Sequence, residues 1–212
     1  PDKLNPKCSV KRGQWYSMGK ILAESAFSDA ALRSGRWDAI TCCSGNNVGP
    51  ILSARQKDAG PWQQNIESMQ LGKYKQDVLG AYRARYTVDV RDMAEAHIQL
   101  FESGNIKNSP HFIVWSTETW NVEVVCGSID RLLPGLGFAG AKFVGWFPEN
   151  IRAREAEFAA IWEACELRNE RIRETLGLEF RALDVSIRDC VEWLLAVGKV
   201  EPKLKLGFEL QT

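Results

Sequence analysis

Short apolar segments alternate along this sequence with segments of helical periodicity, and this alternation constrains the fold more than any other feature. Residues 37–43 form a short apolar run between Gly35 and Gly45, and residues 111–115 form another. Residues 82–90 carry tyrosine, alanine or valine at every second position, as a half-buried strand does. Strands that alternate with helices predict an α/β fold with a mainly parallel sheet.

Several segments carry the apolar spacing of helices. The first is expected to end at Ser34 and Gly35. Asp92 is expected to cap another, because Glu95 completes the spacing of a capping box. Residues 44–50 (SGNNVGP) have the composition of a turn after a strand, and residues 1–13 that of a loop. The expected helices span residues 14–32, 93–102, 119–133, 152–176 and 186–198, with residues 51–80 helical in part.

The charge balance excludes several classes of protein. Among 212 residues, Lys+Arg and Asp+Glu number 27 each, so the formal net charge is zero. A nucleic-acid-binding protein would show a basic excess, and none is expected here. Eight tryptophans and nine phenylalanines indicate a globular chain rather than a disordered one. No apolar run reaches the length of a transmembrane helix, so no membrane span is expected.

The cysteines indicate the compartment rather than a metal site. None of the six belongs to a C-x-x-C pair, and His97 and His111 lie far from them in the sequence. We therefore expect no metal site. Several cysteines fall inside apolar runs, where a free thiol behaves as a small hydrophobic side chain. An intracellular, reducing compartment is expected.

Tyr16 and Lys20 are the best candidates for chemistry. On a helix, side chains four residues apart lie on one face. A tyrosine normally keeps its proton to about pH 10, and a neighbouring ammonium group favours the phenolate. Such a tyrosine can exchange a proton with a carbonyl or alcohol oxygen near neutral pH, while a nicotinamide cofactor supplies the hydride. The spacing alone favours a surface pair with no chemistry, in which the tyrosine is packed and the lysine is solvated.

Four blocks of sequence resemble the extended short-chain dehydrogenases/reductases. Residues 15–27 (WYSMGKILAESAF) resemble the Tyr-x-x-x-Lys helix of that family, most closely the W-Y-x-x-G-K-x-x-A-E pattern of its cinnamoyl-CoA reductase and dihydroflavonol reductase branch. Residues 44–50 resemble its P-G-x-V-x-G-P turn, with Ser44 in place of the first proline. Residues 86–98 (YTVDVRDMAEAHI) resemble its Y-x-x-V-x-D-V-A-x-A-H-I block, and residues 176–181 and 186–192 resemble its closing motif and the helix after it.

The resemblance implies roles for particular residues. Tyr16 would donate a proton to the substrate carbonyl. Lys20 would favour release of that proton and hydrogen-bond the nicotinamide ribose. The backbone beside the nicotinamide of NADP or NAD would be that of Gly45, Asn46, Asn47 and Val48.

Three further residues receive implied or structural roles. Residues near Asp89 would border the substrate pocket together with the turn. Asp92 and His97 are expected to be structural, as a helix cap and a packed helix residue.

The resemblance covers only the second half of the family's chain. That family begins with a strand, a Gly-x-x-Gly-x-x-Gly turn and a helix that holds the cofactor pyrophosphate. Its catalytic Ser or Thr also lies well upstream of the tyrosine, and Ser9 is too close to Tyr16 for that role. The cluster at residues 135–140 (GLGFAG) matches G-x-G-x-x-G by letter, but a predicted helix and Pro134 precede it, so we expect a helix-ending turn.

The expected fold class is therefore α/β, the C-terminal part of a Rossmann-like doubly wound sheet with the N-terminal βαβ units absent. A smaller, mostly helical substrate-domain portion would accompany it. Residues 1–115 would form the Rossmann-like part, interleaved with substrate-side segments around 46–80. Residues 116–212 would form the mainly helical substrate-side region.

Three functions stay open on this basis. The first is an NAD(P)H-dependent reductase of a ketone, aldehyde or acyl-CoA carbonyl, completed by another protein chain or by the N-terminal half. The second is a catalytically inactive, reductase-derived structural subunit of a larger assembly. The third is a binding module that keeps only a small-molecule pocket.

Overall fold

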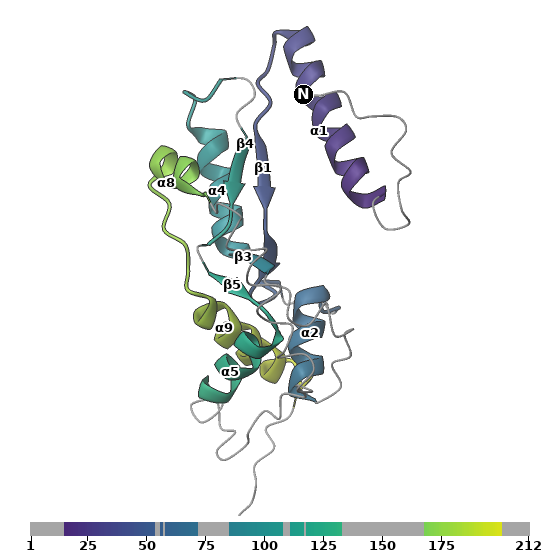
Figure 1. Cartoon of the computed structure of the whole chain (residues 1–212), viewed down its shortest axis with the longest axis vertical. Coiled ribbons are helices and arrows are strands. Elements are labelled where there is room, and N and C mark those ends of the chain that lie inside the picture. The colour runs from purple at the N-terminus through teal and green to yellow at the C-terminus, as the bar shows by residue number, and fades with distance from the viewer. Residues whose placement is uncertain are drawn as a thin grey trace, which may run out of the picture.

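The computed structural model describes residues 15–53, 56, 58–71, 85–107, 111–116, 118–132 and 168–200. Within these ranges the helices lie on both sides of short strands (Figure 1). The helices are α1 (Trp15–Ser34), α2 (Pro61–Gln70), α4 (Val90–Glu102), α5 (Val122–Leu132), α8 (Glu170–Leu176) and α9 (Leu183–Ala196). The strands are β1 (Thr41–Ser44), β2 (Asn46–Val48), β3 (Arg85–Asp89), β4 (His111–Val114) and β5 (Thr119–Trp120).

One stretch of chain, residues 41–48, contributes to two small sheets. Its first half, β1, pairs in parallel with β4, with Thr41 opposite His111. Its second half, β2, pairs in parallel with β3, and β5 joins the other edge of β3 in the antiparallel sense. Gly45 lies between the halves and donates its N–H to the carbonyl oxygen of Val114 at 3.3 Å. The parallel pairing confirms the predicted α/β class.

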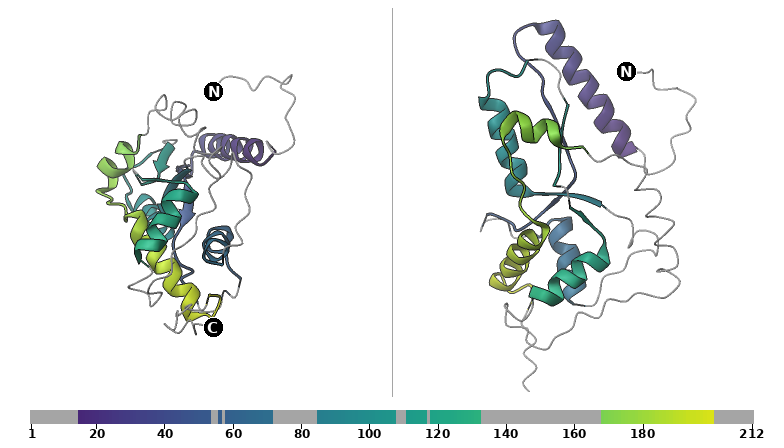
Figure 2. Two further views of the ribbon diagram at one scale, coloured as in Figure 1. Left: turned by 60° about the horizontal axis from the view of Figure 1, so that its bottom comes forward. Right: turned by 60° about the vertical axis from the view of Figure 1, so that its left-hand side comes forward.

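Helix α1 begins and ends close to the predicted positions. Gly35 follows its last residue with a φ of 60° and donates its N–H to the carbonyl oxygen of Ala31 at 3.0 Å. This left-handed residue closes the helix, as the Ser34-Gly35 pair predicted. The helix lies beside β1 and β4, on the side opposite α4 and α8 (Figures 1 and 2). Ala31 is the one residue of α1 that is buried among the described residues.

Helix α4 corrects the predicted cap. Asp89, the last residue of β3, is the N-cap, and its Oδ1 accepts a hydrogen bond from the backbone N–H of Arg91 at 2.9 Å. Asp92 lies in the first turn instead and is buried. Glu95 accepts from Gln99 Nε2 at 2.6 Å rather than completing a capping box. The prediction was wrong because the strand enters the helix without a turn, so the true cap lies one helical turn earlier.

Other boundaries also differ from the predicted ones. The expected turn at residues 44–50 contains β2, because β3 offers this segment a parallel partner. Residues 119–120 are a strand, so the helix expected from residue 119 begins at Val122. The last predicted helix begins three residues earlier, at Leu183. The loop at 1–13, residues 82–84 of the expected strand, the glycine cluster at 135–140 and residues 152–167 lie outside the described residues.

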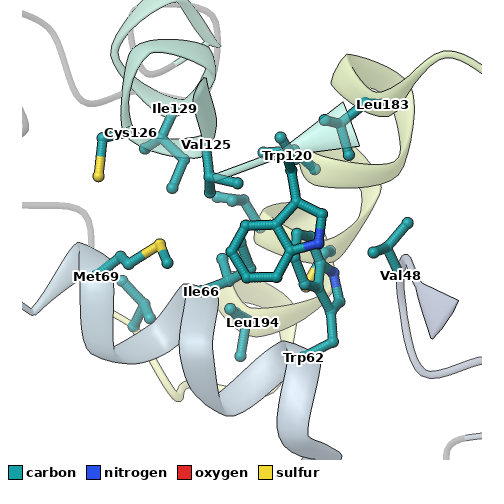
Figure 3. Packing of buried hydrophobic residues seen from close by; sticks show 14 residues of the cluster. Val48, Trp62, Ile66, Met69, Trp120, Val125, Cys126, Ile129, Leu183 and Leu194 are labelled. Carbon is teal, nitrogen blue, oxygen red and sulfur yellow. The ribbon is translucent and has the colours of Figure 1, made fainter. Parts of the chain in front are cut away.

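Two clusters of buried apolar side chains hold these elements together. The larger lies where α2, α5 and α9 pack around β5 and the end of β2, with the rings of Trp62 and Trp120 in the middle (Figure 3). Their ring centroids are 5.1 Å apart, edge to face, an arrangement that ring quadrupoles favour. The smaller cluster joins β3 and β4 to α4 and α8.

Two cysteines behave as the apolar side chains that the sequence predicted. Cys126 and Cys190 are buried in the larger cluster with free thiols. Burial, and to a lesser extent Asp189, raises the pKa of Cys190 to about 12. This thiol therefore stays neutral at physiological pH.

Among the described residues, no helix combines the length and the apolar character needed to cross a membrane.

Candidate functional site

An open cavity of about 1120 Å³ lies where the start of α1, the junction of β1 and β2, the start of α2 and the end of β4 meet. Hydroxyl and amide groups form one part of its wall and aromatic rings form most of the rest. It is lined by Tyr16, Ser17, Ser44, Gly45, Asn46, Asn47, Pro61, Trp62, Asn65, Arg85, Tyr86, Trp115 and Trp120.

Tyr16 and Lys20 lie on one face of α1, as their spacing predicted. The Nζ atom of Lys20 is 5.5 Å from the centroid of the Tyr16 ring. Tyr16 borders the cavity from the first turn of the helix and is 75% exposed. Lys20 lies one turn further along and does not line the cavity itself.

The predicted nicotinamide-side turn divides between the cavity and the core. Ser44, Gly45, Asn46 and Asn47 all line the cavity. The Val48 side chain instead belongs to the larger core cluster and is buried. Asn46 donates from Nδ2 to the carbonyl oxygen of Tyr86 at 3.2 Å, which fixes the turn against β3.

An ionic network centred on the buried carboxylate of Asp89 packs against the end of the turn at residues 44–50. Gly49 has a φ of 106°, and a Cβ atom there would lie 3.0 Å from Oδ2 of Asp89. Asp89 accepts from Nε and Nη2 of Arg91, each at 2.8 Å, and from Oγ of Ser186 at 2.6 Å. Burial raises the pKa of the Asp89 carboxyl, but the hydrogen bonds from Arg91 and Ser186 outweigh it and hold that pKa below its ordinary value. Arg91 also pairs with Asp189 of α9, so the network joins β3 and α4 to α9.

Asp89 itself therefore does not border the cavity. Of the residues that precede it on β3, Arg85 and Tyr86 do. Asp92 and His97 lie away from the cavity, as expected of structural residues. The side chain of Asp92 accepts from the backbone N–H of Arg181 at 2.7 Å and from its guanidinium group. His97 is exposed rather than packed, and its Nδ1 lies 2.8 Å from the carbonyl oxygen of Met93.

Sequence reasoning missed the aromatic walls of the cavity. The rings of Tyr86 and Trp115 are stacked with centroids 4.5 Å apart. The guanidinium carbon of Arg85 lies 5.0 Å from the centroid of the Trp120 ring. A usable signal was present, because Trp115 is the last residue of a predicted strand and ligands in parallel sheets bind beyond the carboxyl ends of the strands.

Comparison with known proteins finds solved structures that share the fold of this chain. No protein-family model matches the chain, and no curated protein matches it in sequence. Solved structures do match it. UDP-glucose 4-epimerase from Bifidobacterium longum, in complex with NAD⁺ and UDP, superposes with a TM-score of 0.60 at 15% identity, covering 87% of this chain and 55% of that one.

Two further solved structures agree with it. Vestitone reductase from alfalfa (Medicago sativa L.) gives a TM-score of 0.59 at 17% identity, over 89% of this chain and 54% of that one. RMD from Pseudomonas aeruginosa, complexed with NADPH, gives 0.55 at 18% identity, over 85% and 56%. The chain therefore shares the fold of the matching part of these structures. The chain spans little more than half the length of the structures it matches.

Proposed function

We propose that this chain forms the proton-donor side of an NAD(P)H-dependent carbonyl reductase. One observation carries the proposal: Tyr16, the implied proton donor, lines a single cavity together with Gly45–Asn47, three of the four residues implied to lie beside the nicotinamide. These segments lie on different elements, so only the fold brings them together. A surface tyrosine without chemistry would have no reason to border the same cavity as this turn.

The proton chemistry belongs to Tyr16. When bound, the nicotinamide supplies a hydride to the carbonyl carbon. The phenolic O–H of Tyr16 donates its proton to the carbonyl oxygen, which prevents the build-up of an alkoxide. Lys20, one turn away, stabilises the phenolate that this donation leaves behind.

The polar wall of the cavity suits the nicotinamide end of the cofactor. Ser17, Ser44, Asn46 and Asn47 offer hydroxyl and amide groups that can hydrogen-bond a carboxamide and a ribose. Gly45 exposes backbone beside them. A volume of about 1120 Å³ is sufficient for this end of the cofactor and a small substrate together. We assign NADP or NAD to this site on the chemistry of these groups.

The aromatic walls favour a planar, apolar carbonyl compound. Tyr16, Tyr86 and Trp115 line the cavity with rings that are not buried, and a flat substrate gains dispersion and stacking contacts against such rings. This supports the cinnamoyl-CoA reductase and dihydroflavonol reductase branch over the sugar-nucleotide epimerases. We therefore propose an aromatic ketone, aldehyde or acyl-CoA thioester as substrate.

Transfer of deuterium tests the proposal directly. The full-length protein is incubated with NADPH or NADH deuterated at C4 and with aromatic and aliphatic carbonyl compounds. We expect deuterium on the former carbonyl carbon of an aromatic product, found by mass spectrometry. Binding of cofactor without transfer to any carbonyl compound would overturn the reductase assignment.

A structural subunit is the second candidate. The specific observation in its favour is that α1, which carries Tyr16, has one buried residue among those described. An active site needs a firmly held donor, and this helix would gain support from another protein chain or from an N-terminal half. Failure of the full-length protein to bind either nicotinamide cofactor would favour this candidate.

A further inference from the structure

The face of α1 that carries Tyr16 and Lys20 continues to a third polar side chain, Glu24. Its carboxylate approaches one side chain on each strand of the parallel pair, Cys43 on β1 and His111 on β4. One ligand atom from each of the three lies within 4.8 Å of the other two. Glu24 Oε1 and His111 Nδ1 are 2.8 Å apart.

The register of the strands produces this convergence. Thr41 lies opposite His111, so Cys43 and His111 stand on the same face of the pair, two positions apart. The alternate residues Phe112 and Val114 are buried in the cluster on the other face. Helix α1 lies on the side of the strand pair that carries Cys43 and His111, so Glu24 of this helix approaches both of these side chains (Figure 1).

The contact with His111 does not fill the hydrogen-bonding capacity of the Glu24 carboxylate. Its Oε1 atom is buried, yet it accepts no hydrogen bond from any described residue, although His111 Nδ1 is near. A buried acceptor without a partner is costly unless a cation or another donor completes it.

The donor set identifies that partner by class. One thiolate sulfur, one imidazole nitrogen and one carboxylate oxygen match the ligands of Zn²⁺, at bond lengths of about 2.0–2.3 Å. Tetrahedral ligands at these lengths stand about 3.3–3.8 Å apart, so binding would widen the 2.8 Å between Glu24 Oε1 and His111 Nδ1 and bring any longer separations within the 4.8 Å limit closer together. Three protein ligands leave the fourth position to water.

We propose that Glu24, Cys43 and His111 bind one zinc-like divalent transition-metal ion that ties α1 to the β1–β4 pair. The ion compensates for the scarcity of buried side chains on α1. The ion also fixes the rotation of α1 about its own axis, and so the direction of the face that carries Tyr16 and Lys20. Tyr16 lies about two helical turns, or about 12 Å, from Glu24. Sequence reasoning excluded a metal site because these residues lie far apart in the chain.

Cobalt titration of the metal-free full chain tests the site. Co²⁺ bound by a thiolate gives a charge-transfer absorption in the near ultraviolet, which an ion pair between Glu24 and His111 cannot give. We expect the band to saturate at one Co²⁺ per chain and to disappear on addition of Zn²⁺. The band should be absent in Cys43→Ser, and His111→Gln and Glu24→Gln should each weaken binding by about tenfold or more.

Two matched controls separate this site from adventitious binding. Cys42→Ser removes the neighbouring thiol, and His97→Gln removes the other histidine, which is exposed on α4. Both should keep the band and the stoichiometry. Zn²⁺ should also slow proteolysis of α1 in the unaltered chain and not in Glu24→Gln. Absence of the band, or its persistence in Cys43→Ser, would overturn the proposal.

Discussion

Asp89 joins three elements through one buried carboxylate. It ends β3, caps α4 and accepts a hydrogen bond from Ser186 on α9. Its position under Gly49 also places it against the turn that lines the cavity. The cavity turn and the ionic network therefore depend on the same residue.

Replacement of this carboxylate should destabilise the fold. Asp89→Asn removes one of the two carboxylates that pair with the Arg91 guanidinium and leaves only Asp189, and we expect the free energy of unfolding to fall by about 2–3 kcal/mol. Urea denaturation followed by circular dichroism measures it. Asp29→Asn is the control, because Asp29 is exposed on α1 and should change stability by less than about 0.5 kcal/mol. Equal stability of the two variants would contradict the role of the network.

The same network predicts a pH dependence. Because the pKa of Asp89 is lowered in the folded state, its contribution to stability is complete above the ordinary aspartate pKa of about 4. That contribution is lost as the pH falls below this value. The unaltered chain should therefore lose more stability than Asp89→Asn between pH 5 and pH 3, roughly the range over which such a carboxyl titrates. Parallel losses in urea titrations would show that Asp89 is not the titrating group.

At the scale of the element, Gly45 is the point where one stretch of chain passes from one sheet to the other. A Cβ atom there would lie 2.7 Å from the carbonyl oxygen and 2.9 Å from the carbonyl carbon of Tyr86. Both are backbone atoms of β3, which cannot move without disturbing its pairing with β2. The glycine therefore serves the fold as well as the cavity wall.

Gly45→Ala should separate the turn from β3. We expect a loss of about 1–3 kcal/mol in the free energy of unfolding, the usual cost of inserting a methyl group into packed structure. Gly19→Ala is a matched control within α1, where a Cβ meets nothing within 4 Å. That change should be neutral or stabilising by up to about 1 kcal/mol, since alanine favours helix. Thermal unfolding compares the two, and a smaller effect at Gly45 than at Gly19 would refute this reading.

The elements show which parts of the fold local sequence can predict. Helix α1 was predicted nearly to its ends because its stop signal, Gly35, is local. Strand β2 was interpreted as a turn because two of its three residues, Asn46 and Asn47, are of a type that favours turns and is depleted in strands. Their pairing with β3 is a contact between distant segments. The capping error at Asp92 has the same origin, since the hydrogen-bond partner of the buried Asp92 side chain is Arg181, which lies 89 residues further along the chain.

At the scale of the whole molecule, the candidate site was predicted in part. Tyr16 and the turn residues were found from their order along the chain. The walls formed by Trp62, Trp115 and Trp120 were not, because aromatic residues are equally common in cores. Indeed Trp62 and Trp120 do both, lining the cavity and filling the larger cluster.

The exposed apolar side chains of α1 predict association. Trp15, Leu22 and Leu32 are more than half exposed on this helix. We expect the isolated 212-residue chain to form dimers or larger species that bury this surface. Sedimentation velocity should show these species, and Leu22→Glu should shift them towards the monomer. Leu52→Glu, at an equally exposed site after β2, should not. A monomeric chain with a cooperative melt would contradict this expectation.

Turnover of a Tyr16→Phe variant tests the central claim, that Tyr16 donates the proton to a carbonyl in this cavity. Phenylalanine keeps the ring and removes only the hydroxyl, and Trp15→Phe on the same turn is the control outside the cavity. With the full-length protein, Tyr16→Phe should lower kcat by about 100-fold or more while NADPH affinity is unchanged. A kcat for Tyr16→Phe equal to that of Trp15→Phe would contradict the account.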